Sequence, residues 1–193
     1  MIGAGNYHSF AVDDKGDVWG WGLNTMGQTG TGITANTGVQ IPTKVIGLSK
    51  EDLNGESVVE IAGGEHHTLF LTSGGKVFAC GRSDGGQLGL PEDDPAFEDR
   101  ENPDFLSEPV QVKFADDTDP VVHISAGIHN NMAVTEGGAL YAWGRGEQGE
   151  LGVGGDPKAS TPTMIVKKEG GSWTALVATC GGQHTLGIFR KKS

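Results

Sequence analysis

The sequence has little cysteine, and its two cysteines do not form a motif. Cys80 and Cys180 lie far apart, and neither belongs to a C-x-x-C pair. A metal knuckle or a dithiol redox motif needs such a pair. We interpret both residues as small buried side chains of a protein in a reducing compartment.

Long apolar runs are also missing. No stretch approaches the roughly 20 apolar residues that a membrane helix needs. The N-terminal "MIGAGNYHSF" has neither the basic region nor the apolar region of a signal peptide. The sequence predicts a soluble chain that is not secreted and has no membrane partner.

Basic residues are scarce relative to acidic ones. Fourteen Lys and Arg stand against 25 Asp and Glu, which gives a net charge of −11. This balance opposes sequence-independent binding to nucleic acid or to an anionic membrane. We expect no direct nucleic-acid binding, and we expect any charged partner to be basic.

Helical periodicity is absent, whereas glycine is abundant. Glycine accounts for 33 of the 193 residues, more than twice the usual share of roughly 7%. A glycine-rich chain should first be searched for repeats, because a missed repeat leads to the wrong fold.

The search finds a repeat of roughly sixty residues. The units contain "GAGNYHSFAVDDKGDVWGWGLNTMGQTGTG" from Gly3, "AGGEHHTLFLTSGGKVFACGRSDGGQLGL" from Ala62, "SAGIHNNMAVTEGGALYAWGRGEQGELGVG" from Ser125 and a shortened "CGGQHTLGIF" from Cys180. The equivalent positions of the G-x-x-H motif are His8, His67, Asn130 and His184.

Each full unit predicts four short strands. An apolar run such as "TLFL" precedes a glycine turn and an alternating run such as "KVFACG", which is typical of a β-hairpin. Gly16, Gly75 and Gly138 occupy matching turn positions, where we expect a positive φ. Proline-flanked runs such as "EPVQVKF" supply the remaining strands. This pattern favours an all-β propeller over a β-solenoid, whose repeats are shorter.

The motifs G-x-x-H-[ST], G-x-V-[FYW]-x-x-G and G-Q-L-G resemble those of the regulator of chromosome condensation family. The resemblance extends over residues 2 to 190 and implies a seven-bladed propeller. Seven blades need on the order of 400 residues, so we expect the C-terminal blades without the first ones. Residues 1–193 are then one partial propeller, an incomplete arc of about three blades plus a final strand. Its units are about 2–60, 61–123 and 124–178, with a closing strand at 179–190.

The repeat predicts that His8, His67, Asn130 and His184 lie around the same end of the propeller. Two interpretations of these residues stay open. Each histidine could hydrogen-bond backbone at a tight turn within its own blade, or together they could form a polar ring that meets a partner.

The sequence argues against a metal, a cofactor or covalent catalysis. His66 and His67 are adjacent, and neighbours on a strand point to opposite faces. A triad of Ser9 or Thr68 with His67 and Asp84 has no unique nucleophile, because similar residues recur in every unit. The phosphate-loop-like stretch 152–160 has proline where glycine should precede its lysine.

The segment "PEDDPAFEDRENPDFLSEP", residues 91 to 109, is acidic and longer than the matching linkers. We judge it too polar and too rich in proline to form a strand. We interpret it as a solvated rim loop, with docking of a basic partner as the alternative.

The resemblance implies a guanine-nucleotide exchange factor for the small GTPase Ran, which promotes nucleotide release by stabilising the nucleotide-free GTPase. It implies a nuclear location, with the cytoplasm as the alternative, and histone or nucleosome binding through parts absent here. By motif position, the GTPase-facing residues are His67 and His184, with weaker candidates at His66, Asn130, Arg82, Asp84 and Glu147.

Two departures limit this reading. Asn130 replaces the histidine of the motif, and the blades that carry the family's essential acidic residues and wedge are missing. Alone, this chain should be a poor exchange factor. A second hypothesis is a protein-interaction propeller of a larger protein, for example a ubiquitin ligase, without exchange activity.

Overall fold

Short antiparallel strands form nearly all the regular structure in the computed structural model, which describes residues 1–34, 37–98, 102–155 and 157–193. The first sheet holds β1 (Ile2–Ala4), β2 (His8–Val12), β3 (Val18–Gly22) and β4 (Val39–Lys44). The second holds β5 (Val58–Gly63), β6 (His67–Thr72), β7 (Val77–Arg82) and β8 (Phe105–Val112). The third holds β9 (Val121–Ala126), β10 (Asn130–Thr135), β11 (Leu140–Arg145) and β12 (Lys158–Val166). The last holds β13 (Trp173–Cys180) and β14 (Thr185–Lys191).

The central hairpins of the three full sheets have the same register. His8 pairs with Gly22, His67 with Gly81, and Asn130 with Gly144. The predicted turn glycines have the expected positive φ, with values of 87° at Gly16, 80° at Gly75 and 83° at Gly138. The hairpins predicted from the alternating runs are therefore confirmed.

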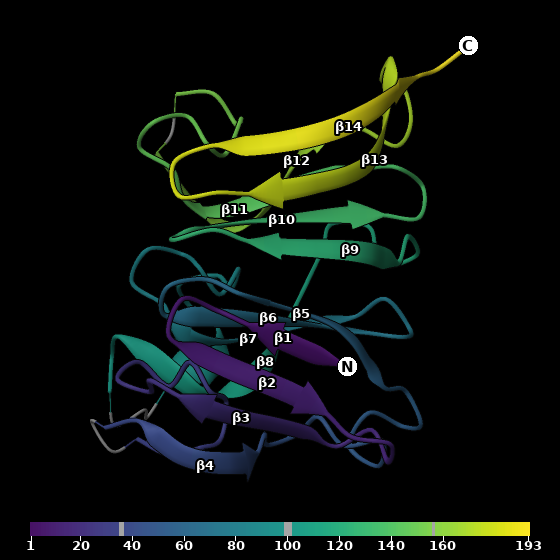
Figure 1. Cartoon of the computed structure of the whole chain (residues 1–193). Coiled ribbons are helices and arrows are strands. Elements are labelled where there is room, and N and C mark those ends of the chain that lie inside the picture. The colour runs from purple at the N-terminus through teal and green to yellow at the C-terminus, as the bar shows by residue number, and fades with distance from the viewer. Residues whose placement is uncertain (35–36, 99–101, 156) are drawn as a thin grey trace.

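The sheets stack face to face, with a hydrophobic core between each pair (Figure 1). Phe10 and Phe70 meet in the core between the first and second sheets. Leu69 and Trp143 belong to the next core, and Met132 and Ala178 to the third. This arrangement confirms the all-β propeller as an incomplete arc.

The end of the chain differs from the predicted single closing strand at 179–190. Trp173–Cys180, which we had placed mostly in the third unit, pairs with β14 as the first strand of a hairpin. β5 and β9 likewise begin at Val58 and Val121, a few residues before the predicted boundaries. The reason is that the strand before each G-x-x-H loop pairs with the strand after it.

The acidic segment is also partly different from expectation. Residues 99–101 lie outside the described residues, and Pro95–Phe97 form the 3-10 turn η1. Residues 105–109, which we judged too polar for a strand, belong to β8 because Phe105 and Leu106 are buried. Among the strands that the structure describes, β8 pairs with β7 alone, and such an edge strand tolerates Pro109.

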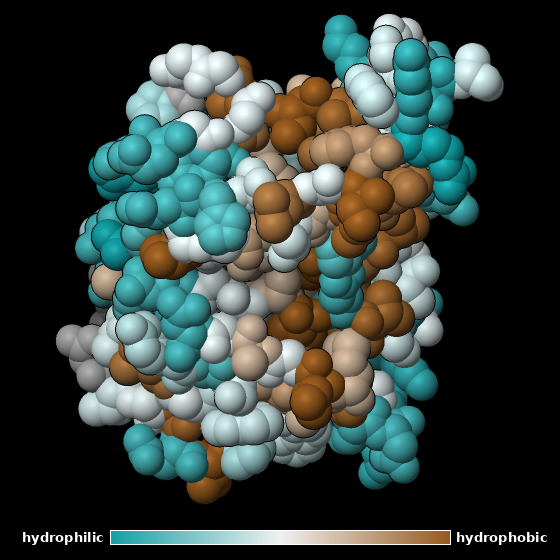
Figure 2. Space-filling view, turned by 45° about the horizontal axis from the view of Figure 1, so that its top comes forward, coloured by the Kyte–Doolittle hydropathy of each residue, from teal (hydrophilic) through white to brown (hydrophobic). Residues whose placement is uncertain are grey.

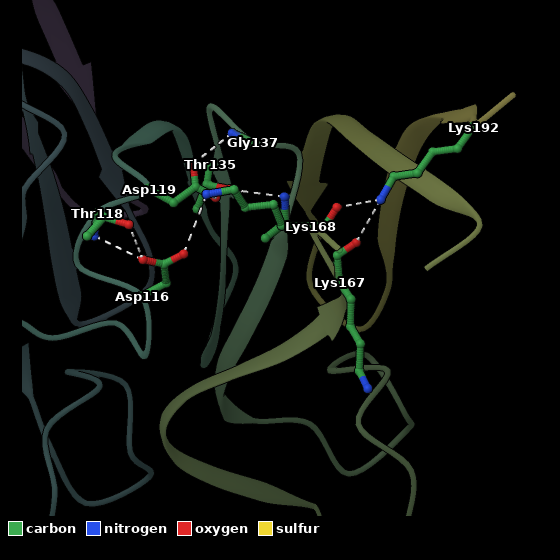
Figure 3. A network of polar contacts seen from close by, with 9 residues as sticks. Asp116, Thr118, Asp119, Thr135, Gly137, Lys167, Lys168 and Lys192 are labelled. Carbon is green, nitrogen blue, oxygen red and sulfur yellow. Dashed lines mark hydrogen bonds and ion pairs between the residues drawn. The ribbon is translucent and has the colours of Figure 1, made fainter. Parts of the chain in front are cut away.

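The end of the stack that carries the hairpin turns is held by charged groups (Figure 3). The buried Asp119 carboxylate accepts hydrogen bonds from Thr135 Oγ1 and from the Gly137 amide, both at 2.7 Å. Lys168 Nζ lies 3.8 Å from Asp119, and Lys192 Nζ donates to the Lys168 carbonyl at 2.6 Å. These contacts connect the third sheet to the last hairpin. Within the described part of the chain, no helix is long and apolar enough to cross a membrane.

Candidate functional site

The G-x-x-H motif forms a tight loop between the first two strands of each sheet. In the second sheet the Gly64 amide donates to the His67 carbonyl at 2.9 Å, and the imidazole ring lies against Gly64. A Cβ at Gly64 would overlap both the His67 ring and the carbonyl oxygen of Gly127. The motif needs glycine because the next sheet approaches at this point.

The histidines of this motif connect neighbouring sheets. His8 Nε2 lies 2.7 Å from Thr68 Oγ1, and His67 Nε2 lies 2.7 Å from Asn131 Oδ1. Thr68 Oγ1 donates its own proton to the Gln28 carbonyl at 2.7 Å. It must therefore accept from His8, which assigns the proton of this neutral imidazole to Nε2. The expected bond to backbone within one blade is wrong, because these side chains bond to the next sheet.

Burial corrects two of the predicted contact residues. His67 and Asn130 are each only 1% exposed, although we had assigned both to a surface that faces a partner. A side chain buried between two sheets cannot touch a partner while the sheets stay packed. His184 occupies the same motif position on the last hairpin and is exposed.

Burial also controls protonation of the two linking histidines. Loss of hydration lowers the pKa of His67 from 6.5 to about 4, against the raising effect of its hydrogen bond to Asn131. Loss of hydration, with repulsion from His67, lowers the pKa of His8 to about 3. Both rings are neutral at physiological pH.

We therefore expect acid to unfold this protein through His8 and His67. Below pH 6.5 the unfolded chain binds protons at both residues, whereas the folded chain does not until about pH 4 and pH 3. The stabilisation is complete above pH 6.5 and falls as the pH decreases. At pH 5 the unfolding free energy of the protein should be lower by about 2 kcal/mol for each of the two histidines. Urea unfolding at several pH values between 7.5 and 5 measures this loss. An unfolding free energy that does not change over this range would contradict the prediction.

The third sheet lacks the histidine link. Asn130 Nδ2 is buried and has no hydrogen-bond partner among the described residues. Thr185 Oγ1 donates to the Glu150 carbonyl at 2.9 Å, just as Thr68 does to Gln28. The acceptor side of the link is thus present, and the shorter asparagine does not reach it.

Asn130→His should stabilise the protein by about 1 kcal/mol, because the longer ring can donate to Thr185 Oγ1 and the orphaned amide disappears. The gain is measured by urea unfolding at pH 7.5. In Thr185→Val, which lacks the acceptor, the same substitution should give no gain. A gain in that background would show that the effect has another cause.

Above the buried layer, loop residues form a charged surface that we name the loop face. It consists of Tyr7, Glu65, His66, Arg82, Asp84, His129, Arg145 and Glu147. Glu65 lies 3.5 Å from His66 Nδ1 and 3.8 Å from His129 Nε2, and so joins loops of two sheets. Partial burial lowers the pKa of His129, although Glu65 opposes this effect.

Two equivalent ion pairs frame the loop face. Arg82 holds Asp84 with two hydrogen bonds of 2.7 Å. This contact raises the pKa of Arg82 and lowers that of Asp84. Arg145 pairs with Glu147 at the same repeat position in the third sheet. A hollow of about 430 Å³ beside this pair is lined by Glu65, Ile128, His129, Arg145, Glu147, Gln148, Glu150, Gly182 and Gln183.

The structure thus brings four predicted residues together on the loop face, namely His66, Arg82, Asp84 and Glu147. Sequence reasoning missed Glu65, His129 and Arg145. The repeat carried a signal for two of them, since His129 aligns with His66 and Arg145 with Arg82. The described residues hold no cluster of three side chains suited to a metal ion.

Comparison with known proteins supports these observations. The model of the RCC1-like domain matches residues 1–187. The chain is 37% identical to protein pim1 of Schizosaccharomyces pombe over 190 residues, which are 96% of this chain and 34% of pim1. It is 30% identical to the guanine nucleotide exchange factor SRM1 of Saccharomyces cerevisiae, over 96% of this chain and 38% of that protein. The crystal structure of Prp20p from the same yeast, studied for binding to Gsp1p and histones, superposes with a TM-score of 0.87 at 28% identity. That match covers all of this chain and 44% of Prp20p, so the chain spans well under half of these relatives.

Proposed function

Because the chain belongs to the RCC1-like family, we propose that it is part of a guanine-nucleotide exchange factor for the small GTPase Ran. SRM1, a relative at 30% identity, is named a guanine nucleotide exchange factor. The observation that carries the proposal is the loop face, where charged side chains from two successive sheets meet beside a polar hollow. The chain would act by binding, without making or breaking a covalent bond.

Nucleotide exchange depends on a difference in the factor's affinity for two states of the GTPase. A factor that bound the nucleotide-loaded and nucleotide-free GTPase equally would leave nucleotide release unchanged. Glu65, His66 and His129 can exchange their mutual contacts for contacts with the GTPase, because they are only partly buried. The Arg82–Asp84 pair is held by two hydrogen bonds and would act as a fixed rim.

His67 and His8 would contribute indirectly. They hold neighbouring sheets together directly beneath the loop face, so their role is to position the loops. His184, which is exposed, keeps the contact role that motif position assigns to it. A nuclear location and histone contacts through other parts of the protein complete the proposal, in line with the histone binding studied for Prp20p.

The test measures how this chain binds Ran in two states. Immobilised nucleotide-free Ran should retain the 193-residue chain more strongly than GDP-bound Ran. Glu65→Gln combined with His129→Ala should weaken binding at least tenfold. Lys76→Ala, at the opposite end of the second sheet, is the matched control and should bind normally.

The second measurement is release of fluorescent GDP from Ran. The 193-residue chain should accelerate release weakly, and a longer protein that includes the preceding blades should do so strongly. Equal affinity for both Ran states, together with no acceleration by the longer protein, would exclude exchange. That result would favour the interaction-module hypothesis.

A further inference from the structure

The first strands of successive sheets lie beside one another along one side of the stack (Figure 1). β5, β9 and β13 each pair with a single neighbour among the strands that the structure describes, so each has one edge without a strand partner. Backbone groups on such an edge need other hydrogen-bond partners. Between β9 and β13, Cys180 N donates to Ser125 Oγ at 2.9 Å, and the Ala178 carbonyl lies 2.8 Å from His123 Nε2. Side chains of β9 thus take the place of a strand partner for β13.

His123 connects three strands through its two ring nitrogens. Its Nδ1 lies 2.8 Å from Glu60 Oε1 on β5, and its Nε2 lies 2.8 Å from the Ala178 carbonyl on β13. The other oxygen of Glu60 accepts a hydrogen bond from Ile124 N at 3.2 Å. An ionised carboxylate and a carbonyl can only accept hydrogen bonds, so both ring nitrogens must donate. The geometry therefore requires a charged imidazolium at His123.

On the strands packed against β9, which are β5, β6, β10 and β13, Glu60 is the only charged side chain. The other titratable groups on these strands are His67 and the Cys180 thiol. Burial raises the pKa of the thiol to about 12, so it stays neutral, and His67 is neutral at physiological pH. The hydrogen bond from Glu60 is accordingly the main reason that the pKa of His123 is raised.

Apolar side chains lie next to both partners of this ion pair. His123 follows Val122 on β9, and Glu60 follows Val59 on β5. Figure 2 shows hydrophobic side chains gathered over the middle of the stack, between hydrophilic ones. The strands packed against β9 therefore offer no second charged donor that could bond to the Ala178 carbonyl in place of His123.

We propose that His123 is a pH-sensitive link, which holds β13 against the third sheet and releases it when the ring loses a proton. A neutral imidazole keeps one proton, and the bond to the Glu60 carboxylate is the stronger of the two because it is charge-assisted. Nδ1 therefore keeps its proton. Nε2 then presents a lone pair to the Ala178 carbonyl at 2.8 Å, and two acceptors at that distance repel each other.

The release weakens the contact between the third sheet and the last hairpin. β13 keeps the bond between Cys180 N and Ser125 Oγ and its apolar packing, but it loses the contact at Ala178. β13 leads directly into the loop with Gly182 and Gln183, which form one wall of the hollow beside Arg145 and Glu147. Alkaline pH should therefore loosen that wall. The inference concerns contacts within the chain and does not depend on the proposed function.

An NMR titration of the imidazole nitrogens tests the protonation of His123 in the 193-residue chain. The midpoint should lie above pH 6.5, and above the midpoint the ring should carry its proton on Nδ1. In Glu60→Gln the midpoint should fall by about one pH unit or more. The neutral ring of this variant should keep its proton on Nε2, because an amide can donate to Nδ1. A wild-type midpoint below pH 6.5, or a neutral wild-type ring with its proton on Nε2, would overturn the proposal.

Amide hydrogen exchange measures the release of β13. After correction for the intrinsic rate, protection of the Cys180 amide should decrease about tenfold as the pH rises through the midpoint of His123. In Glu60→Gln the protection should stay constant over the same pH range, because the bond to Ala178 persists. Glu56→Gln is the matched control, since Glu56 pairs with Lys76, and it should respond like the wild type. Constant protection in the wild type, or an unchanged decrease in Glu60→Gln, would overturn the proposal.

Discussion

Trp143→Ala is expected to cost about 3–5 kcal/mol of unfolding free energy, which is enough to unfold much of a marginally stable chain. Trp143 is fully buried between the second and third sheets. Its indole N–H donates to the Gln87 carbonyl at 3.1 Å, and its ring meets the Phe114 ring edge-on. Removing the ring leaves a cavity that the paired strands cannot close.

Urea unfolding followed by circular dichroism measures this loss. The Gln87 carbonyl also accepts from Asn131 at 2.8 Å, so it stays satisfied and the cavity dominates. Trp173→Ala is the control, because Trp173 is 49% exposed at the start of β13. It should cost less than about 1 kcal/mol. Equal losses in both variants would contradict the stacking of the second and third sheets.

The second large effect is expected at the adjacent histidines. His67→Ala should cost about 2–4 kcal/mol, because it removes a buried ring and leaves Asn131 Oδ1 without its donor. His66→Ala, one residue earlier on the loop face, should change stability by less than about 0.5 kcal/mol. Under the proposed function, His66→Ala should in turn weaken Ran binding, because His66 lies on the loop face.

The same pair of variants tests the acid response. His67→Ala removes one of the two groups whose pKa is lowered by burial, so it should lose about half of the destabilisation between pH 7.5 and pH 5. His66→Ala should keep the full response. A variant of His67 with an unchanged acid profile would assign the response to other groups.

His123 should change the unfolding free energy in the opposite direction, because its contribution decreases as the pH rises. Its hydrogen bond to Glu60, at 2.8 Å, raises the pKa of His123 despite partial burial. A raised pKa stabilises the folded chain below pH 6.5, and this stabilisation is lost as the pH rises through the folded-state value. The lowered pKa values of His8 and His67 and the raised pKa of His123 together should give the largest unfolding free energy near neutral pH.

Local patterns were sufficient for the central hairpins and for four residues of the loop face. The positive φ of Gly16, Gly75 and Gly138 and the hairpins around them follow from turn chemistry within a few residues. His66, Arg82, Asp84 and Glu147 follow from the repeat, since equivalent residues lie at equivalent places. The first strand of the last hairpin was misplaced, because the strand pairing that defines it spans a loop.

What the sequence by itself determined is the repeat, the strands, the hairpin register and the family, since each depends on spacing along the chain. Only the tertiary structure decided that His67 is buried while His66 is partly exposed, that Asn130 Nδ2 has no hydrogen-bond partner among the described residues, and that β13 belongs to the last hairpin. The physical reason is that burial depends on which side of a sheet meets the next one. That side is determined by packing between segments about sixty residues apart, and no local pattern contains it.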